Sequence, residues 1–319
     1  MTLGTLRYVV QRVLLIAFTA LAVSSIVFLG IHRLPGDAFV SERLRPSQEA
    51  ALLHQYGLDR PLLVQYQDFI TNLVFHGDLG RSIANRGTSI TPLVLREATV
   101  SAEIGAVALI FTVGMGMVFG VFAAIRQNSW VDYLLSATSV VGYSMPNFVL
   151  ASFLILVFGL GLEHLTDGAF FYELGWTGRY GRLGEIVVPA FALGFPYASI
   201  VARLTRASML EVVRQDYVRT ARAKGLQEQV VIVRHALRNA LIPVITILGP
   251  LVVGIITGSV VVENLFGIPG LGKEFVQSIL NRDYNIVIGV FTGYAALVGM
   301  ANLAVDLVYP LIDPRIRYG

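Results

Sequence analysis

Cysteine is absent from the sequence of 319 residues. This absence excludes disulfide bridges, thiolate zinc sites, iron–sulfur clusters and a cysteine nucleophile. Charge is also scarce: charged residues make up 14% of the chain, whereas about 25% is usual in soluble domains. Hydrophobic residues reach 55%, which is more than a compact soluble domain can bury and the opposite of what disorder requires. The composition therefore indicates an integral membrane protein.

Long stretches without Asp, Glu, Lys, Arg or His divide the chain. A membrane-spanning helix needs about 20 predominantly apolar residues, so these stretches predict an all-α membrane protein with six transmembrane helices. The first stretch is too long for the apolar part of a cleaved signal peptide and lacks a small-residue cleavage site, so we expect it to be retained. The six stretches are 13–31, 104–125, 133–162, 186–202, 239–262 and 284–305.

Basic residues are distributed unequally between the connections. The N-terminus, the 126–132 loop, segment 203–238 and the C-terminal tail together contain 13 basic and 5 acidic residues. The opposite connections, which include segment 32–103, contain 11 basic and, with Glu103 left aside as a helix-end group, 14 acidic residues. Because Lys and Arg are enriched in cytoplasmic loops, we predict that both termini and segment 203–238 are cytoplasmic. Segment 32–103 is then external, and its glycine turns and helical apolar spacing predict short helices on the outer surface.

One pattern resembles a phosphate-binding loop, from Gly267 to Lys273 (GIPGLGK). A nucleotide-binding loop requires Ser or Thr after the lysine and a strand before the first glycine, whereas Glu274 follows here and a predicted membrane helix precedes. No histidine lies at metal-binding spacing, and the predicted spans contain no ionisable residue of the kind that proton-coupled carriers use. We therefore expect no catalytic residue, no metal site and no cofactor in this chain.

Glycine and proline interrupt three of the predicted spans, at 142–147, 194–197 and 249–254. Proline removes an intrahelical hydrogen bond, and inside a membrane the freed carbonyl needs a neighbour or water. Such sites either line a cavity or adjust helix packing, and the sequence leaves both readings open. The polar side chains that could line a translocation path there are Tyr143, Ser144, Asn147, Tyr197 and Ser199.

Segment 203–238 has two apolar helical patterns separated by Gly225. Spacings of three and four residues predict one apolar face on each helix, and Gly225 is expected to end the first helix in left-handed geometry. The resulting helix–turn–helix unit could lie on anionic lipid or dock a partner protein. The first face comprises Leu210, Val213, Tyr217 and Ala221, and the second comprises Val230, Val233 and Leu237.

Two motifs in this segment resemble the cytoplasmic EAA loop of ABC-importer permeases in its peptide-transporter form. They run from Asp216 to Leu226 (DYVRTARAKGL) and from Arg234 to Pro243 (RHALRNALIP). Ala221, Gly225 and Leu237 match the general family pattern, whereas Arg219, Thr220, His235 and Arg238 depart from it. Further segments resemble the same family in the same order, so that the likeness covers essentially the whole chain. These segments are 34–37, 56–61, 76–80, 262–272 and 313–318.

The resemblance implies a type I ABC importer permease fold, with residues 1–319 forming a single permease domain in the bacterial cytoplasmic (inner) membrane. It implies a second homologous permease as heterodimer partner and two cytoplasmic ATPase subunits that hold ATP and Mg. An external peptide-binding protein would deliver oligopeptides or dipeptides, and no nucleic acid is involved. Segment 203–238 would then contain the coupling helix that contacts the ATPase. The coupling residues would be Tyr217, Arg219, Thr220, Ala221, Lys224, Gly225, Leu226, His235 and Leu237.

Two alternatives remain open at this point. Relatives of peptide permeases also import nickel complexes, glutathione or other small solutes, so the fold alone does not determine the cargo. A secondary carrier or channel without ATPase partners is an alternative of a different class. The absence of ionisable residues in the predicted spans and the length of segment 203–238 favour the ATP-driven importer.

Overall fold

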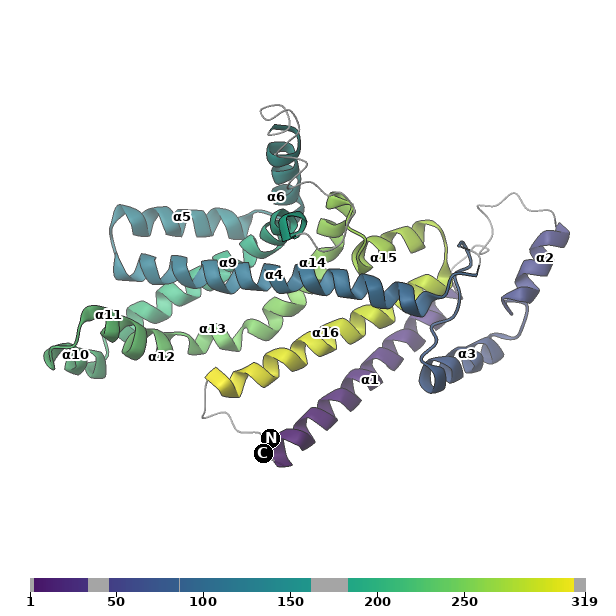
Figure 1. The fold of residues 1–319 in the computed structure, drawn as a ribbon, viewed down its shortest axis with the longest axis horizontal. Helices are drawn as coiled ribbons and strands as arrows, with labels where there is room; N and C mark the ends of the chain where they lie inside the picture. Colours follow the sequence, from purple (N-terminus) through teal and green to yellow (C-terminus); the bar gives the residue numbers. More distant parts are fainter. Residues whose placement is uncertain (1–2, 34–45, 86, 162–182, 313–319) are drawn as a thin grey trace. The chain divides into compact units, whose positions relative to one another are not determined.

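The computed structural model describes residues 3–33, 46–85, 87–161 and 183–312. Within these ranges the chain is helical, apart from an isolated antiparallel bridge between Arg81 and Ser89. Figure 1 shows the helices in chain order. They are α1 (Leu3–Ile31), α2 (Pro46–Gln55), α3 (Leu62–Thr71), η1 (Asn72–His76), α4 (Ile90–Ile125), α5 (Trp130–Ser144), α6 (Asn147–Leu154), η2 (Ile155–Gly161), α9 (Leu183–Val213), α10 (Asp216–Ala223), α11 (Glu228–Val230), η3 (Val231–Leu237), α12 (Arg238–Ala240), α13 (Ile242–Thr246), α14 (Leu248–Phe266), α15 (Leu271–Leu280) and α16 (Tyr284–Ile312).

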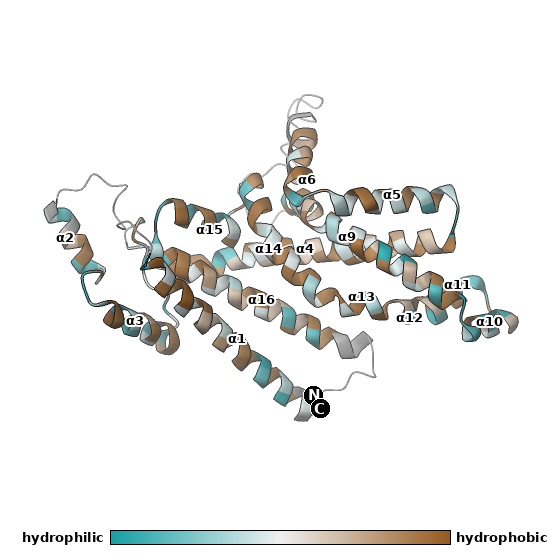
Figure 2. Ribbon diagram, turned by 180° about the vertical axis from the view of Figure 1, so that it is seen from behind, coloured by the Kyte–Doolittle hydropathy of each residue, from teal (hydrophilic) through white to brown (hydrophobic). Residues whose placement is uncertain are grey.

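Five of the described helices, α1, α4, α9, α14 and α16, are long and apolar enough to cross a membrane. A sixth candidate is the pair formed by α5 and α6 with the start of η2, which passes the same test together but is bent by 106°. Hydrophobic residues run along the long helices, whereas α10 and α11 carry hydrophilic residues (Figure 2). The prediction of an all-α membrane protein is confirmed, with six spans if the bent pair counts as one.

Several predicted boundaries are wrong. The long helix α4 begins at Ile90, inside the predicted external segment 32–103, and α9 continues to Val213, past the predicted start of the loop at residue 203. The charge criterion ends a span too early because long helices tolerate charged side chains in their outer turns. The predicted short helices of the external segment are confirmed as α2 and α3. The family-like segments 34–37 and 313–318 lie outside the described residues.

The effects of proline also differ between the predicted interruptions. The group at 142–147 separates α5 from α6. The group at 249–254 lies inside α14, so that predicted interruption is wrong, and the stretch 239–262 is divided instead at Leu241 and Ile247, among α12, α13 and α14. In contrast, α9 continues through Pro189 and Pro196 without a break, so the predicted interruption at 194–197 is wrong. A neighbouring helix supports this part of α9, since Thr112 Oγ1 donates a hydrogen bond of 3.0 Å to the carbonyl of Gly194.

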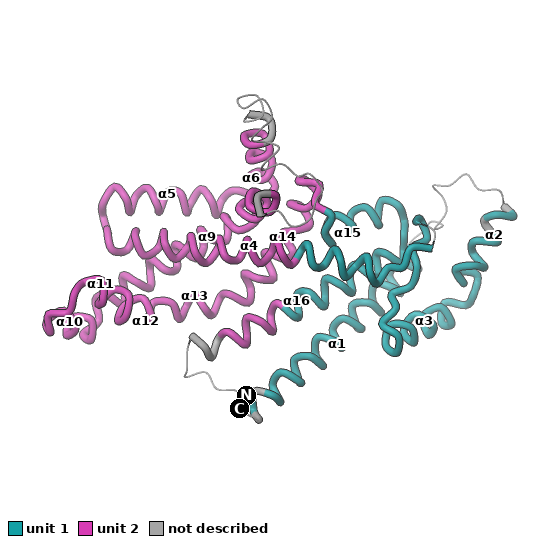
Figure 3. Tube along the Cα trace, viewed as in Figure 1, with its two compact units in different colours: residues 1–101, 269–300, 318 teal, residues 102–268, 301–317, 319 magenta. Residues whose placement is uncertain are grey.

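The chain forms two compact units (Figure 3). Unit 1 comprises residues 1–101, 269–300 and 318, and unit 2 comprises residues 102–268, 301–317 and 319. The long helices α4 and α16 therefore contribute residues to both units.

The core of unit 1 joins α1, α3 and α16. Phe28 of α1 packs with Val287 and Ile288 of α16. The rings of Tyr66 and Phe69, from α3, lie 5.5 and 5.4 Å from the Phe28 ring, measured between centroids. These two aromatic residues belong to the helical apolar pattern in segment 32–103, so that pattern is confirmed as a packing face.

A buried carboxylate fixes the start of α16 in unit 1. Asp283 accepts hydrogen bonds from Ser82 Oγ at 2.5 Å and from the backbone N–H groups of Ile83 and Ala84 at 3.0 Å. It also accepts one from the N–H of Ile286, at 3.2 Å, in the first turn of α16. One side chain thus caps a helix and holds a turn that is 200 residues away in sequence.

In unit 2, α9 approaches α4 at two glycines spaced four residues apart. A Cβ atom at Gly116 would lie 2.6 Å from Val201 Cβ, and one at Gly120 would lie 2.5 Å from Thr205 Cβ. Real Cβ atoms do not approach so closely, so these positions require glycine. Helices in lipid gain no hydrophobic free energy from association, and close backbone approach at small residues replaces it.

Two further helices use glycine against α9. A Cβ atom at Gly142 of α5 would overlap Ser199 Oγ and the Phe195 ring. A Cβ atom at Gly254 of α14 would lie 2.8 Å from the Tyr197 hydroxyl oxygen. Therefore α9 is enclosed by glycine-containing faces of α4, α5 and α14.

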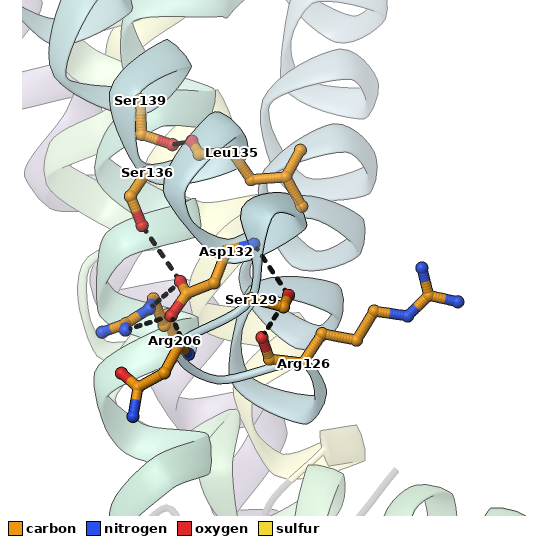
Figure 4. A network of polar contacts seen from close by, with 8 residues as sticks. Arg126, Ser129, Asp132, Leu135, Ser136, Ser139 and Arg206 are labelled. Carbon is orange, nitrogen blue, oxygen red and sulfur yellow. Dashed lines mark hydrogen bonds and ion pairs between the residues drawn. The ribbon is translucent and has the colours of Figure 1, made fainter.

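An ion pair joins α5 to α9 at the N-terminal end of α5 (Figure 4). Arg206 Nε and Nη2 donate to the two carboxylate oxygens of Asp132, both at 2.7 Å. The same carboxylate accepts bonds from Ser136 Oγ at 3.2 Å and from the N–H of Asn128 at 3.0 Å. The Asp132 side chain is only 3% exposed, so its charge is compensated almost entirely by these four donors.

Breaking this pair should destabilise the protein. Asp132→Asn removes the counterion of Arg206, and Arg206→Gln leaves a buried carboxylate, so each should cost about 2 kcal/mol. Because each single variant already breaks the pair, the double variant should cost less than the sum of the two. Equilibrium unfolding of the detergent-solubilised chain measures the free energy of unfolding of wild type, both single variants and the double variant. Ser136→Ala is the control with a smaller expected loss, and strictly additive effects would contradict a coupled pair.

Candidate functional site

The segment that follows α9 forms a helical hairpin, comprising α10, the Gly225 turn, α11 and η3. Gly225 has a φ of +76°, in the left-handed region. The N–H of Leu226 donates to the carbonyl of Ala221, and the N–H of Gly225 donates to that of Arg222. This is the hydrogen-bond pattern of a helix that ends on a left-handed glycine, so the prediction for Gly225 is confirmed.

The predicted apolar face of the first helix is confirmed at Leu210, Val213 and Ala221, which pack in apolar clusters, and is wrong at Tyr217. Residues 214–215 interrupt the helix between α9 and α10, so one helical spacing does not run through both helices. Val218 and Ala221 are buried, whereas Tyr217 is 43% exposed. Ala221 therefore packs inside the hairpin, against Val218 and Val231, and does not face outward.

The second predicted face is shifted. Val231 and Ala236 are buried, while Val230 and Val233 are exposed. The cause is the π-helical turn of η3, which is wider than the α-helical spacing assumed from the sequence. Ala236 packs with Met209 of α9, so the hairpin is attached to that helix.

Two polar contacts brace the hairpin. Arg222 donates two hydrogen bonds to Glu228, with Nη2–Oε1 at 2.7 Å and Nε–Oε2 at 3.1 Å, across the Gly225 turn. These bonds raise the pKa of Arg222 and lower the pKa of Glu228, so both side chains remain charged near neutral pH. Closer to the membrane helices, Asn239 Nδ2 donates to the Tyr217 hydroxyl at 2.8 Å. The sequence reasoning missed both contacts.

The outer surface of this hairpin combines apolar and polar groups. Its exposed apolar side chains include Tyr217, Leu226 and Val233. Among the predicted coupling residues, Arg219, Thr220, Lys224 and Gly225 are also exposed, while His235 and Leu237 are half-buried. A rigid hairpin with exposed apolar groups is suited to docking into a protein groove.

A cavity of about 280 Å³ lies at the break between α5 and α6. Met145 is extended there because the residue before a proline avoids the helical region, and Pro146 then precedes α6. Four predicted path residues meet in the lining, and Pro196, Ile200, Met145 and Pro146 complete it. The four are Tyr143, Ser144, Asn147 and Tyr197.

Ser199 does not line this cavity. It is 3% exposed, faces Gly142 and donates to the carbonyl of Phe195 at 3.0 Å. Its neighbours Tyr197 and Ile200 lie on the cavity side of α9 instead. The spacing of Pro196 and Ile200 along α9 is the signal that could have identified the lining face from the sequence.

The first four residues of the phosphate-loop pattern, 267–270, form a turn between α14 and α15, and its last three residues begin α15. Gly267, with a φ of +69°, ends α14, and Gly270 precedes α15. The element before the pattern is the helix α14 and not the strand that a nucleotide-binding loop requires. Glu274 stands where a nucleotide-binding loop has the Ser or Thr that holds magnesium. Burial raises the pKa of this carboxyl group, and the nearby Asp283 raises it further. The interpretation of this segment as turns is confirmed for residues 267–270. The described residues contain no group of three or more potential metal ligands.

Comparison with known proteins identifies the family. Residues 116–318 match the binding-protein-dependent transport system inner membrane component, and residues 5–97 match the N-terminal part of such components. The chain is 41% identical over 312 residues, 98% of both chains, to the dipeptide transport system permease protein DppB of Bacillus subtilis. It is 39% identical over 314 residues to the oligopeptide transport system permease protein OppB of Salmonella typhimurium, covering 98% of this chain and all of that one.

Among solved structures, an amino acid ABC transporter crystallised with histidines is similar, with 19% identity and a TM-score of 0.47. The alignment covers 71% of this chain and 95% of that one. The family matches and the two permease relatives confirm the resemblance to ABC-importer permeases of the peptide-transporter form. The chain therefore belongs to the family of binding-protein-dependent transport system inner membrane components.

Proposed function

We propose that this chain is the permease subunit of an ATP-driven importer that moves dipeptides or oligopeptides across the bacterial cytoplasmic membrane. The observation that carries this proposal is the identity of 39–41% over 98% of the chain to permeases of dipeptide and oligopeptide systems. The two compact units would act together as one permease domain.

The partners follow from the proposed function. A second homologous permease completes the translocation path, two cytoplasmic ATPases bind ATP and Mg, and an external binding protein delivers the peptide. The assignment of nucleotide to other subunits is supported by the helical context of the Gly267–Lys273 pattern and by the half-buried Glu274 that follows it.

The hairpin of α10, α11 and η3 is the proposed contact for the ATPase. Its exposed Tyr217, Leu226 and Val233 would enter a groove of that subunit, while Val218 and Ala221 hold the hairpin together from inside. Movement of the hairpin would pass to α9, on which it packs, and to α5 through the Asp132–Arg206 pair. The other end of α5 borders the cavity, so closure of the ATPases would alter the cavity.

The cavity favours peptide over a bare metal ion. Its polar lining groups are hydroxyls of Tyr143, Ser144 and Tyr197 and the amide of Asn147. Neutral groups of this kind hydrogen-bond to peptide amides, whereas a transition-metal ion such as nickel is bound best by imidazole, thiolate or carboxylate ligands. A secondary carrier would show no dependence on ATPase subunits, and copurification of the chain with an ATPase separates that alternative.

The orientation proposal places both termini and the hairpin in the cytoplasm, because basic residues are enriched on that side. Reporter fusions after Asp132 and after Arg238 should give cytoplasmic signals, and a fusion near Gln48 should give an external signal. An external signal at Arg238 would overturn this orientation and with it the proposed ATPase contact.

The cargo is tested by uptake into proteoliposomes that contain the complete transporter and its binding protein. Labelled tri- to pentapeptides should accumulate when ATP is supplied to the ATPase side, and nickel should not. The control is the same assay without ATP. Strong accumulation of nickel with no peptide uptake would reject the peptide assignment and leave the permease architecture intact.

Gly225 should be required for coupling. A Cβ at this position would meet no neighbour within 4 Å. The cost of Gly225→Val, about 1–2 kcal/mol, therefore comes from the left-handed backbone alone. Relief of this strain would tilt the helix that follows. Peptide-stimulated ATPase activity and uptake should fall sharply while the chain still inserts in the membrane.

Gly225→Asn is the matched control, because asparagine tolerates left-handed geometry and should preserve more activity than valine. A second variant, Ala221→Asp, places a carboxylate against Val218 and Val231 and should abolish coupling by opening the hairpin. Equal uptake by wild type, Gly225→Val and Ala221→Asp would refute the role of the hairpin.

A further inference from the structure

Two arginines lie three residues apart on α9 and have different surroundings. Arg206 is engaged by Asp132 through two hydrogen bonds. Arg203 lies over the ring of Tyr143, with its Cζ atom 4.3 Å from the ring centroid, and it is exposed. No acidic side chain within the described ranges forms an ion pair with Arg203. Its positive charge is thus held in a fixed place without a counterion there.

Tyr143 connects this arginine to the cavity. The same ring that supports the guanidinium also lines the cavity at the α5–α6 break. On α9, Pro196, Ile200 and Arg203 follow at spacings of four and three residues, so they share one helical face. Because Pro196 and Ile200 line the cavity, the backbone of Arg203 lies about one helical turn beyond its wall, and the guanidinium reaches the ring of Tyr143, a lining residue.

The stacked geometry leaves the hydrogen-bonding edge of Arg203 available. A guanidinium is planar, and its five N–H groups point outward in that plane, so stacking on a ring does not consume them. The stacking itself contributes about 0.5–1 kcal/mol at an exposed site and limits the orientations of the side chain. A planar fork of this kind matches the two oxygens of a carboxylate.

We propose that Arg203 and Tyr143 form a subsite for a carboxylate of the transported peptide, above all its C-terminal carboxylate. This inference rests on the proposed function. Ser144 and Asn147 in the adjoining cavity would meet the neighbouring peptide amides. The subsite binds weakly because Arg203 is exposed and water competes for its donors. Weak binding suits a transport path, since the peptide must leave it.

The test uses the complete transporter in proteoliposomes, with its partner permease, ATPases and binding protein. The probes are labelled tetra-alanine and its C-terminal amide, each at a concentration that saturates the binding protein. The maximal uptake rate is measured for wild type, Arg203→Gln and Arg203→Lys. Arg126→Gln is the matched control, because Arg126 is another exposed arginine of unit 2 whose side chain points away from the network at the start of α5 (Figure 4).

Arg203→Gln should lower the uptake rate of tetra-alanine about tenfold and that of the amide much less, because only the free acid uses the charged fork. Arg203→Lys should fall between wild type and Arg203→Gln, since lysine keeps the charge and loses the planar fork. Arg126→Gln should change neither rate.

Three results would overturn the subsite. Equal slowing of both peptides by Arg203→Gln would show that the arginine does not discriminate a carboxylate. An effect that disappears when anionic lipids are replaced by zwitterionic ones would assign Arg203 to a lipid phosphate. If wild type takes up both peptides and one of these two results is seen, the subsite is rejected and the proposed function stands. If wild type takes up neither peptide, the proposed function fails together with the subsite.

Discussion

Close approach of neighbouring helices to α9 is the constraint on which unit 2 depends. Lipid tails are as apolar as the side chains of the helices, so association must come from tight contact and polar links. Gly116 and Gly120 of α4, Gly142 of α5 and Gly254 of α14 supply the contact, since each would overlap with α9 if it carried a Cβ. The Asp132–Arg206 pair supplies a polar link whose buried charge is fully hydrogen-bonded.

Because α9 is long, it connects the cavity with the hairpin. The helix has 31 residues, which at about 1.5 Å per residue spans about 46 Å. Along it lie the cavity wall at Pro196 and Ile200, the arginine pair, and the attachment of the hairpin at Met209. Close packing against α4, α5 and α14 restricts how far α9 can bend. In the proposed mechanism, a displacement of the hairpin would pass along α9 to the cavity.

The sequence predicts those features that depend on local chemistry. Charge-free stretches identify the spans because an unpaired charge in lipid is costly, and Gly225 is readable because a left-handed residue is a local requirement. The faces of the hairpin are not readable in this way. A two-residue interruption after α9 and the π-helical turn of η3 each rotate the register, so that Val218 is buried where the spacing indicated Tyr217. Glycines that suggested interruptions, such as Gly194 and Gly254, are instead contact surfaces, which depend on partners distant in sequence.

The cavity shows why a break in a membrane helix is useful to a permease. Pro146 separates α5 from α6, and the two helices diverge by 106°, which opens space beside an otherwise closely packed α9. The groups that face this space are neutral and accept many arrangements of hydrogen bonds, so they suit a cargo whose side chains vary. The termini of a peptide do not vary. In the proposed subsite, the guanidinium of Arg203 beside neutral groups would recognise what all peptides share, and discrimination among side chains would be left to the proposed binding protein.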